Sequence, residues 1–318
     1  MSCRYSVVIR TLGNTGEKYR RTLDSILVQT LSPTEIVVAI PDGFPLDHQI
    51  GTERIVRCPK GMVTQRIVGI DAANGDYMLV IDDDIEMPPD FVEKMYETLS
   101  ERNLDCVLAF CDEILKPSLK YTGVLKKCRG AFTGQYFYSG RKSEYYDVIT
   151  GTAGHRTYVN HPEGMCQTGC FQCFFIKKDA ALSVHFQDDR WLEQGSLSTY
   201  AAYDDAVFFY KLFLKGGRIA YAINARYIHL DGSAGRKAQS KLDSKRIRLY
   251  SIARNRYVFW HKYIYPSRHS AATKFAGLYA LVNYTLYSVA VNLWPKYWPA
   301  IKALFAGYRD ARKCLREQ

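Results

Sequence analysis

Residues Tyr77–Asp84 read YMLVIDDD, an apolar run that ends abruptly in three consecutive carboxylates. Runs such as Met78–Ile81 are typical of strands buried on both faces of a parallel sheet, whose ligands lie at the carboxyl ends of the strands. Alternate side chains of an extended chain share a face, so Asp82 and Asp84 are expected to converge while Asp83 turns away. The pattern predicts a site for a hard cation and a phosphate, with a solvated acidic turn as the alternative.

The sequence on both sides of this run alternates strand-like and helix-like segments. They are expected at Tyr5–Arg10 (strand), Tyr19–Gln29 (helix), Glu35–Ile40 (strand), Met62–Ala73 (helix), Tyr77–Ile81 (strand) and Phe91–Leu99 (helix). Asn74-Gly75-Asp76 and Pro88-Pro89-Asp90 punctuate the last two boundaries. Such alternation implies right-handed crossovers and predicts a Rossmann-like α/β fold with a mostly parallel central sheet flanked by helices.

The pattern degrades from about residue 111 to about 165, where Lys, Arg, Tyr and Gly dominate without a period. This stretch is interpreted as a long insertion. Beyond it, a strand is expected at Cys170–Ile176, a helix at Asp204–Lys215 closed by Gly216-Gly217, and a strand at Arg218–Ile223.

Charge and cysteine content restrict the class of protein. The 43 Lys and Arg residues exceed the 32 Asp and Glu residues, and the net charge of +11 suits a nucleotide diphosphate, an anionic lipid surface or nucleic acid. Nine scattered cysteines argue against a disulfide framework and for a reducing cytosol. Cys170 and Cys173 form a lone C-x-x-C, which favours two half-buried strand residues over zinc ligands. No signal peptide is expected, because Met1–Arg4 leads directly into a short strand.

Residues Phe275–Pro295 contain no charged side chain, although Asn283 and Asn292 make insertion into a bilayer costly. Three interpretations stay open: helices at the membrane interface, a helix docked on the protein, or a span. Trp294–Trp298 and the basic residues of Arg309–Arg316 favour an interfacial anchor.

Several blocks occur in a characteristic order. They are Thr22–Thr30 (TLDSILVQT), Pro33–Val38, Asp42-Gly43, Gly61–Gly69, and Gly75–Tyr77 running into Asp82–Asp84. Together they resemble the inverting glycosyltransferases of family 2, which have the GT-A fold. The resemblance is closest over residues 5 to about 100 and weaker up to about 260. It implies transfer of a single sugar from a nucleotide-diphosphate sugar, expected to be a UDP-sugar, to a glycan or lipid-linked acceptor, with Mn²⁺ or Mg²⁺ as cofactor.

The resemblance also implies roles for individual residues. Asp84 is expected to hold the metal against the diphosphate, and His229 is either a second metal-site residue or a structural histidine. The expected donor-binding residues are Thr11, Asp42, Arg66, Asp82 and Asp83. Pro41 replaces the acidic residue that usually precedes Asp42, so the donor base is open.

Asp204-Asp205 resembles the Glu-Asp motif with which a helix begins in this family, and Asp205 is expected to be the general base. Displacement at an anomeric carbon needs such a base near the acceptor hydroxyl, opposite the leaving diphosphate. Asp204 and Trp191 are expected on the acceptor side. From the residues alone, helix capping is the alternative for the acidic pair and core packing the alternative for Trp191.

Gln187–Trp191 matches the Q-x-x-R-W pattern of processive synthases, but it precedes Asp204-Asp205 instead of following it, so a single transfer is expected. Three other functions are alternatives. A phosphohydrolase would need its acidic motif on the first strand, which ends at Arg10-Thr11. A nucleotidyltransferase would need a better glycine-rich loop than Leu12–Gly16. A basic binder of anionic lipid or nucleic acid remains as the non-enzymatic alternative, suggested by Lys116–Lys142.

The sequence thus predicts three regions. Residues 1–110 form the nucleotide-sugar-binding half, 111–250 the acceptor-binding half with the insertion at about 111–165, and 251–318 a helical, membrane-associating segment. The expected protein is a peripheral enzyme at the cytoplasmic, inner face of a membrane, without a nucleic-acid partner. The resemblance to family 2 implies a role in bacterial surface polysaccharide synthesis.

Overall fold

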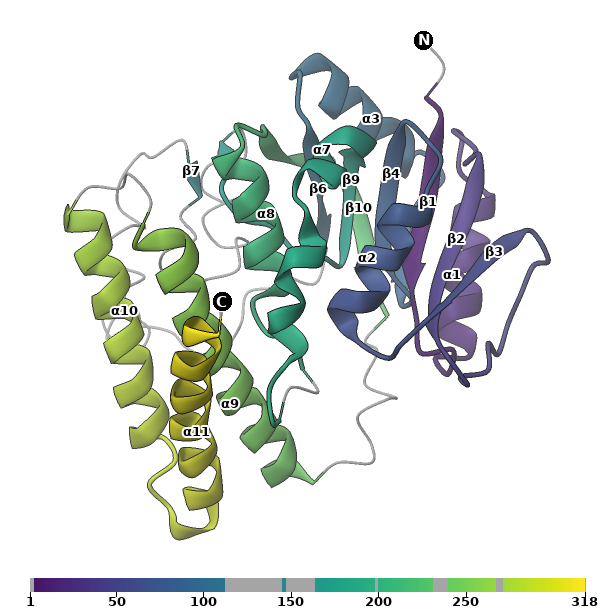
Figure 1. Ribbon diagram of the computed structural model, residues 1–318. Coiled ribbons are helices and arrows are strands. Elements are labelled where there is room, and N and C mark those ends of the chain that lie inside the picture. Colours follow the sequence, from purple (N-terminus) through teal and green to yellow (C-terminus); the bar gives the residue numbers. More distant parts are fainter. Residues whose placement is uncertain are drawn as a thin grey trace, which may run out of the picture.

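The computed structural model describes residues 3–111, 145–146, 164–197, 200–230, 240–266 and 271–317. Most of the predicted insertion therefore lies outside the described residues. Figure 1 shows one central sheet with helices packed on its faces and a group of long helices beside it.

The N-terminal half of the sheet is parallel, as the sequence predicts. Its strands are β1 (Tyr5–Arg10), β2 (Glu35–Pro41), β3 (Glu53–Cys58) and β4 (Tyr77–Asp82), in the order β3-β2-β1-β4. The connecting helices are α1 (Glu17–Leu27) and α2 (Met62–Ala72), and α3 (Phe91–Glu101) follows β4. The register sets Arg10 opposite Asp82, the last residues of β1 and β4, so both end at the same edge of the sheet.

The second half of the sheet is mixed. β9 (Cys173–Lys177) runs antiparallel between β4 and β6 (Cys106–Cys111), and β10 (Ile219–His229) runs parallel to β6. Two-residue strands β7 (Tyr145–Tyr146) and β8 (Met165–Cys166) extend this side. β10 continues past the predicted end at Ile223, through an irregularity in its pairing with β6. Cys170 precedes β9 instead of lying within the strand.

An antiparallel pairing beyond β4 brings a residue that is distant in the sequence to the edge of the sheet. The short strand β5 (Ile85–Glu86) pairs antiparallel with the end of β10, with His229 opposite Ile85. The backbone N–H of Leu230 donates to the carbonyl of Asp84 at 2.8 Å. His229 is thereby held next to the turn that carries the acidic triplet.

The core forms two layers, one on each face of the sheet, because side chains alternate along buried strands. Val7 and Ile9 of β1 face α1 and α3, whereas Val8 faces α2 and the elements that follow β9. Those elements are α7 (Lys178–Ser183), the 3₁₀ segment η3 (Phe186–Glu193) and α8 (Asp204–Leu214). Leu79 and Val80 of β4 divide between the two layers in the same way. This arrangement confirms the predicted class of α/β fold.

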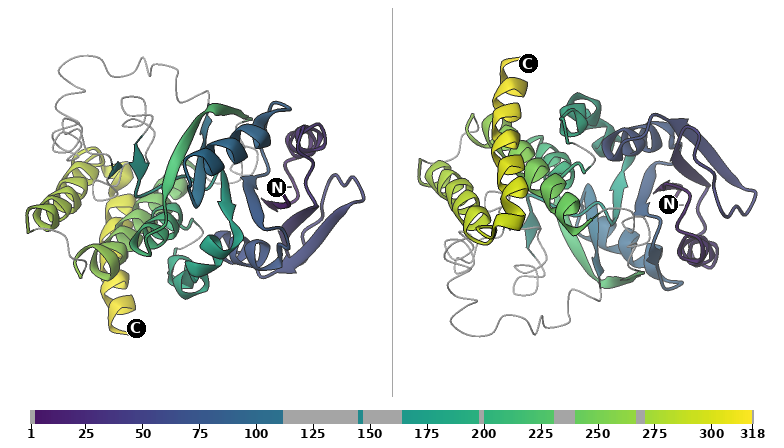
Figure 2. Two further views of the ribbon diagram at one scale, coloured as in Figure 1. Left: turned by 90° about the horizontal axis from the view of Figure 1, so that it is seen from above. Right: turned by 90° about the horizontal axis from the view of Figure 1, so that it is seen from below.

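The C-terminal helices lie beside the sheet (Figures 1 and 2). They are α9 (Lys241–Phe259), the π-helical turn η5 (Trp260–Ile264), α10 (Ala271–Ala290), the 3₁₀ turn η6 (Pro295–Tyr297) and α11 (Trp298–Arg316). Gly307 of α11 lies so close to α9 that a Cβ there would come within 2.5 Å of the Tyr250 carbonyl oxygen. Among the helices of the described residues, none is both long and apolar enough to cross a bilayer.

Candidate active site

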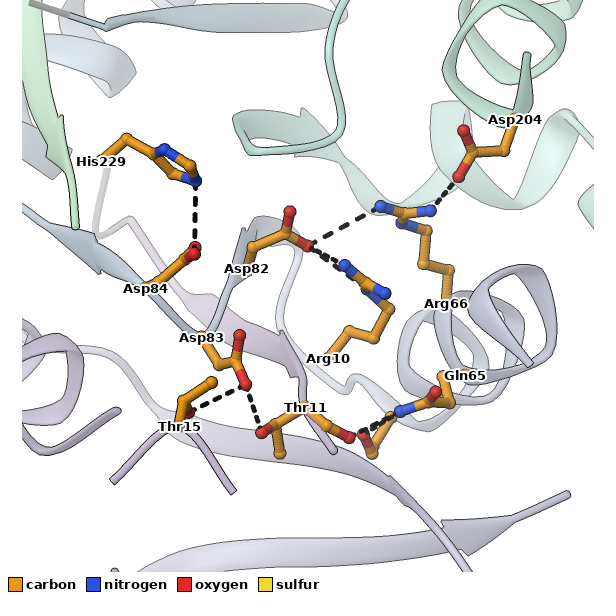
Figure 3. A network of polar contacts seen from close by, with 11 residues as sticks. Arg10, Thr11, Thr15, Gln65, Arg66, Asp82, Asp83, Asp84, Asp204 and His229 are labelled. Carbon is orange, nitrogen blue, oxygen red and sulfur yellow. Dashed lines mark hydrogen bonds and ion pairs between the residues drawn. The ribbon is translucent and has the colours of Figure 1, made fainter. Parts of the chain in front are cut away.

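The three carboxylates after β4 meet three different sets of partners (Figure 3). Asp82 accepts a hydrogen bond from the Arg10 guanidinium at 2.8 Å. Asp84 lies 3.3 Å from Nε2 of His229. The expected convergence of Asp82 and Asp84 on one point is wrong, because β4 ends at Asp82 and the next two residues form a turn, where strand alternation no longer applies.

Asp83 turns toward the first loop of the fold, where Thr11 and Thr15 donate hydrogen bonds to its Oδ2 at 2.5 and 3.0 Å. Thr11 is buried, and its hydroxyl also accepts from the N–H of Gly13. Burial raises the pKa of Asp83 to about 6, although the bond from Thr11 opposes the shift. The hydrogen bond between Thr11 and Asp83 therefore holds the loop between β1 and α1 against the end of β4.

Gln65 on α2 holds the same loop from the other side. Its Nε2 donates to the carbonyl oxygens of Thr11 at 2.7 Å and Ala39 at 3.0 Å, and the side chain is buried. Sequence analysis missed this residue, since an isolated glutamine on a helix gives no pattern.

Arg66, the next residue of α2, contacts both the acidic triplet at the end of β4 and the acidic pair at the start of α8. Its guanidinium forms an ion pair with Asp204 and lies 3.7 Å from Oδ1 of Asp82. It also lies over the ring of Phe171, at 4.1 Å from the centroid. The side chain is buried, so its charge interacts with both carboxylates with little screening by water. Arg10, which sequence analysis also missed, supplies a second cation to Asp82.

Asp204 and Asp205 are the first two residues of α8. The N-cap residue is Tyr203, in a left-handed conformation with φ of 74°, and no side chain caps the helix. Asp204 is instead held by Arg66, and Asp205 accepts from the N–H of Ala206 at 2.7 Å. Burial, followed by the nearby charge of Asp204, raises the pKa of Asp205 to about 7. A carboxylate with such a pKa can accept a proton near neutral pH.

Asp42 and Trp191 stand apart from this network. Asp42 follows β2 in an exposed turn, at the same edge of the parallel strands as Asp82. Trp191 is only 1 % exposed, and its Nε1 donates to Asp189 at 2.8 Å. Asp189 also accepts from Lys211 and Tyr263. Trp191 therefore packs in the core, which was the alternative interpretation, and its ring presents no face to an acceptor here.

The residues at the end of β4 fit a divalent cation that is shared with a ligand. Among the described residues no three His, Cys, Asp or Glu side chains cluster in a way that could hold a metal alone. Asp84 and His229 nevertheless offer a carboxylate oxygen and an imidazole nitrogen 3.3 Å apart. Cations of nucleotide sites are commonly held by one or two protein ligands, with phosphate and water supplying the remainder. Asp84 and His229 could therefore hold such a metal.

Comparison with known proteins agrees with this architecture. The model of "Glycosyl transferase family 2" matches residues 49–161, a range that includes the helix of Arg66 and the acidic triplet. The glucosyl-dolichyl phosphate glucuronosyltransferase of Haloferax volcanii is 29 % identical over 114 residues, which are 33 % of this chain and 36 % of that protein. The chain thus matches only about a third of the length of that curated relative.

A solved structure extends the comparison to nearly the whole chain. The mannosyltransferase PcManGT from Pyrobaculum calidifontis, in complex with GDP-Man and Mn²⁺, superposes with a TM-score of 0.50 at 12 % sequence identity. The match covers 97 % of this chain and 87 % of that one, and at this identity it is informative about the fold alone. The chain therefore carries a glycosyl transferase family 2 domain on a GT-A-like fold.

Proposed function

We propose that this protein is a metal-dependent, inverting glycosyltransferase that moves one sugar from a nucleotide-diphosphate donor to a lipid-linked or glycan acceptor. The observation that carries the proposal is the position of Arg66, which contacts Asp82 beside the acidic turn and Asp204 next to Asp205. One buried cation thus contacts Asp82, two positions before the proposed metal ligand Asp84, and Asp204, which is adjacent to the proposed base Asp205.

The donor half would bind the nucleotide diphosphate at the carboxyl edge of β1, β2 and β4. Asp42 is exposed at this edge and would meet the nucleoside, as would the loop held by Thr11 and Asp83. Arg66 would exchange part of its carboxylate pairing for a phosphate oxygen, and Asp84 with His229 would hold Mn²⁺ or Mg²⁺. When bound, the metal would supply charge stabilisation for the diphosphate.

The acceptor half would carry out the proton transfer. Asp205 would accept the proton of the acceptor hydroxyl. At the same time the hydroxyl oxygen of the acceptor attacks the anomeric carbon of the donor sugar, and the bond between that carbon and the diphosphate breaks. Attack opposite the leaving group inverts the configuration at that carbon. The pKa of Asp205, raised to about 7 by burial and by Asp204, suits this role, since the group is substantially ionised near neutral pH yet basic enough to take a proton.

The substrates are proposed from the names of the similar proteins and from the sequence. The name of the Haloferax relative favours a lipid-linked acceptor. UDP is retained as the expected nucleotide from the sequence, and GDP is a second candidate because the structural neighbour was solved with GDP-Man. Nucleic acid is not proposed as a partner, and a role in bacterial surface polysaccharide synthesis rests on the resemblance seen in the sequence. Residues 1–110 and 111–250 are proposed as the donor and acceptor halves.

A transfer assay tests the proposal. Purified protein is incubated with labelled UDP-, GDP- and dTDP-sugars, Mn²⁺, and polyprenyl-phosphate or glycolipid acceptors, and the released diphosphate and labelled lipid are quantified. One donor should react, with loss of product in Asp205→Asn. Absence of turnover with every donor, or equal turnover in Asp205→Asn, would instead favour a non-catalytic binder or another base.

A further inference from the structure

The positive charge of this protein is concentrated in its C-terminal helices. Between Asp243 and Asp310 the sequence contains no Asp or Glu, whereas eleven of the 43 Lys and Arg residues lie there. This stretch alone therefore accounts for the whole net charge of +11, and the rest of the chain is neutral. Six of the eleven lie on α9 and η5, and four, Lys274, Lys296, Lys302 and Arg309, lie on α10, α11 and the connection between them. A region of one sign indicates a partner of opposite charge.

The same helices expose an unusual amount of apolar surface. Nine of the 17 exposed large apolar side chains in the described residues lie within residues 275–305. Four of them follow helical spacing along one face of α10, and the others lie in the α10–α11 connection and on α11. They are Phe275, Leu278, Val282 and Leu286 on α10, Val291, Leu293 and Trp294 in the connection, and Trp298 and Phe305 on α11.

The connection between α10 and α11 presents its apolar side chains in a defined conformation. Trp294 is 72 % exposed and Leu293 is 61 % exposed. The Nε1 of Trp298 donates to the Leu293 carbonyl at 3.1 Å, and Asn292 donates to the Ser288 carbonyl at 2.6 Å. These bonds fix the turn around two protruding apolar side chains, so their exposure is built into the fold.

The opposite faces of both helices are already used. α11 packs Ala303, Leu304 and Gly307 against α9, and α10 packs Leu281 toward α9 and η5. The hydroxyls of Thr285 on α10 and Tyr308 on α11 are 2.5 Å apart and link the two helices. The outward face of α11 instead alternates aromatic and cationic side chains, with Trp298, Lys302, Phe305 and Arg309 at helical spacing.

We propose that the α10–α11 hairpin, residues 271–316, docks the protein on an anionic membrane surface. Tryptophan with neighbouring lysine is the composition of an interfacial anchor, and the apolar side chains would enter the boundary of the acyl chains while the cations meet phosphate headgroups. A second copy of the chain fits this surface poorly, because the cations Lys274, Lys296, Lys302 and Arg309 would face their own copies with no acidic residue of the hairpin before Asp310 to offset them.

The docked orientation is consistent with the position of the site. In Figure 1 the parallel strands point toward the lower edge of the molecule, and the α10–α11 connection lies at that same end. The connection and the carboxyl ends of the parallel strands, one of which is Asp82, therefore lie toward the same end of the molecule. This inference goes beyond the transfer reaction, since membrane binding needs no turnover.

Vesicle flotation tests the inference with the full chain. Vesicles of phosphatidylcholine alone are compared with equimolar phosphatidylcholine and phosphatidylglycerol, at about 0.1 M and about 1 M salt, between which the Debye length falls from about 10 to about 3 Å. We expect binding to the anionic vesicles and a loss of at least tenfold at high salt. The Lys296→Glu/Lys302→Glu variant should also lose at least tenfold, since each basic residue near such a surface contributes about a factor of five.

Apolar insertion is tested separately. Leu293→Ser/Trp294→Ser should reduce flotation at least tenfold, whereas Leu27→Ser/Val28→Ser at the C-terminal end of α1, at positions 54 % and 57 % exposed, should bind as the wild type does. Equal binding of the hairpin variants and the α1 variant would overturn the proposal. The proposal would also be overturned if the wild type formed a dimer and did not bind anionic vesicles, and if Leu293→Ser/Trp294→Ser were a monomer. Either result would leave the transfer assay in detergent as an independent test of the proposed function.

Discussion

Arg66 on α2 forms a buried ion pair with Asp204, the first residue of α8, although 138 positions separate them in the chain. The same guanidinium approaches Asp82 at the end of β4. One side chain thereby connects the acidic triplet at the end of β4, in the parallel half of the sheet, with the start of α8, the helix that precedes β10 in the mixed half. In the proposed enzyme this contact aligns the donor with the base.

Removing this cation should destabilise the protein. Arg66→Met leaves Asp204, which is 8 % exposed, without its partner, and an uncompensated buried charge costs about 3–5 kcal/mol. Urea denaturation at pH 7 measures the loss. Arg66→Lys is the matched variant: it keeps the charge but loses the planar fork, so it should recover part of the stability. A loss below about 1 kcal/mol in Arg66→Met would contradict the importance of the bridge.

Asp205→Asn should separate binding from chemistry. A general base contributes about 10²–10⁴-fold, so kcat should fall by about that factor while the Kd for nucleoside diphosphate, measured by isothermal titration calorimetry, stays within about twofold. The Kd should change little because the hydrogen bond of Asp205 is to the N–H of Ala206, on its own helix, and not to the acidic turn. Weakened diphosphate binding would indicate a structural role, and unchanged kcat would rule out Asp205 as the base.

The pH dependence of activity should oppose that of stability. Asp205 has a folded pKa of about 7, above its ordinary value near 4, and Asp83 is shifted in the same direction to about 6. Between about pH 4 and 7 the folded state holds protons that the unfolded state has lost, so the free energy of unfolding falls as pH rises. Activity should rise over the upper part of this range, because the base must be ionised.

Asp205→Asn also provides the control for this titration. It should be more stable than the wild type at pH 8 by roughly 1–3 kcal/mol, with a flatter stability profile between pH 4 and 7. Thermal unfolding at a series of pH values measures both. If stability depends on pH as steeply in Asp205→Asn as in the wild type, Asp205 is not the group that titrates.

Metal binding should depend on Asp84, in the turn after β4, and on His229, at the end of β10. Asp84→Asn and His229→Gln should each weaken Mn²⁺ binding in the presence of nucleoside diphosphate by at least about tenfold, measured by the loss of the free Mn²⁺ signal in electron paramagnetic resonance. Asp76→Asn is the matched control, since this exposed carboxylate precedes the other end of β4. Equal loss in all three variants would indicate a general charge effect in place of coordination.

Local patterns predict much of the fold. β1, β2 and β4 are continuous apolar runs bounded by turn residues, which makes them recognisable. β3 was missed because ERIVRC carries three charged residues, which an edge strand paired only with β2 can leave exposed. The end of β10 was missed because it pairs with the two-residue strand β5, a long-range contact that leaves no periodic signal.

The sequence predicts which acidic residues form the candidate site, but it does not predict which side chains they contact. The acidic triplet and Asp204-Asp205 could be identified as motifs, and the role assigned to each of their residues stays a prediction. The partners of these carboxylates depend on tertiary contacts, such as Arg66 with Asp204 and Asp84 with His229. Arg10 could have been found from the register of β1 against β4, since it is the terminal residue opposite Asp82. Strand alternation failed at Asp84 because the chain turns there.

Thermal unfolding with UDP, GDP, dTDP and CMP, each with and without Mn²⁺, tests whether a metal and a nucleoside diphosphate bind together at the end of β4. A ligand at about 100 times its Kd stabilises the native state by about 2.7 kcal/mol, which raises Tm by roughly 5 °C in a protein of this size. We expect such a shift for one nucleoside diphosphate, only with Mn²⁺, and we expect Asp84→Asn to lose it and Asp76→Asn to keep it. A shift that is independent of Mn²⁺ and retained in Asp84→Asn would contradict a metal-diphosphate site at the end of β4.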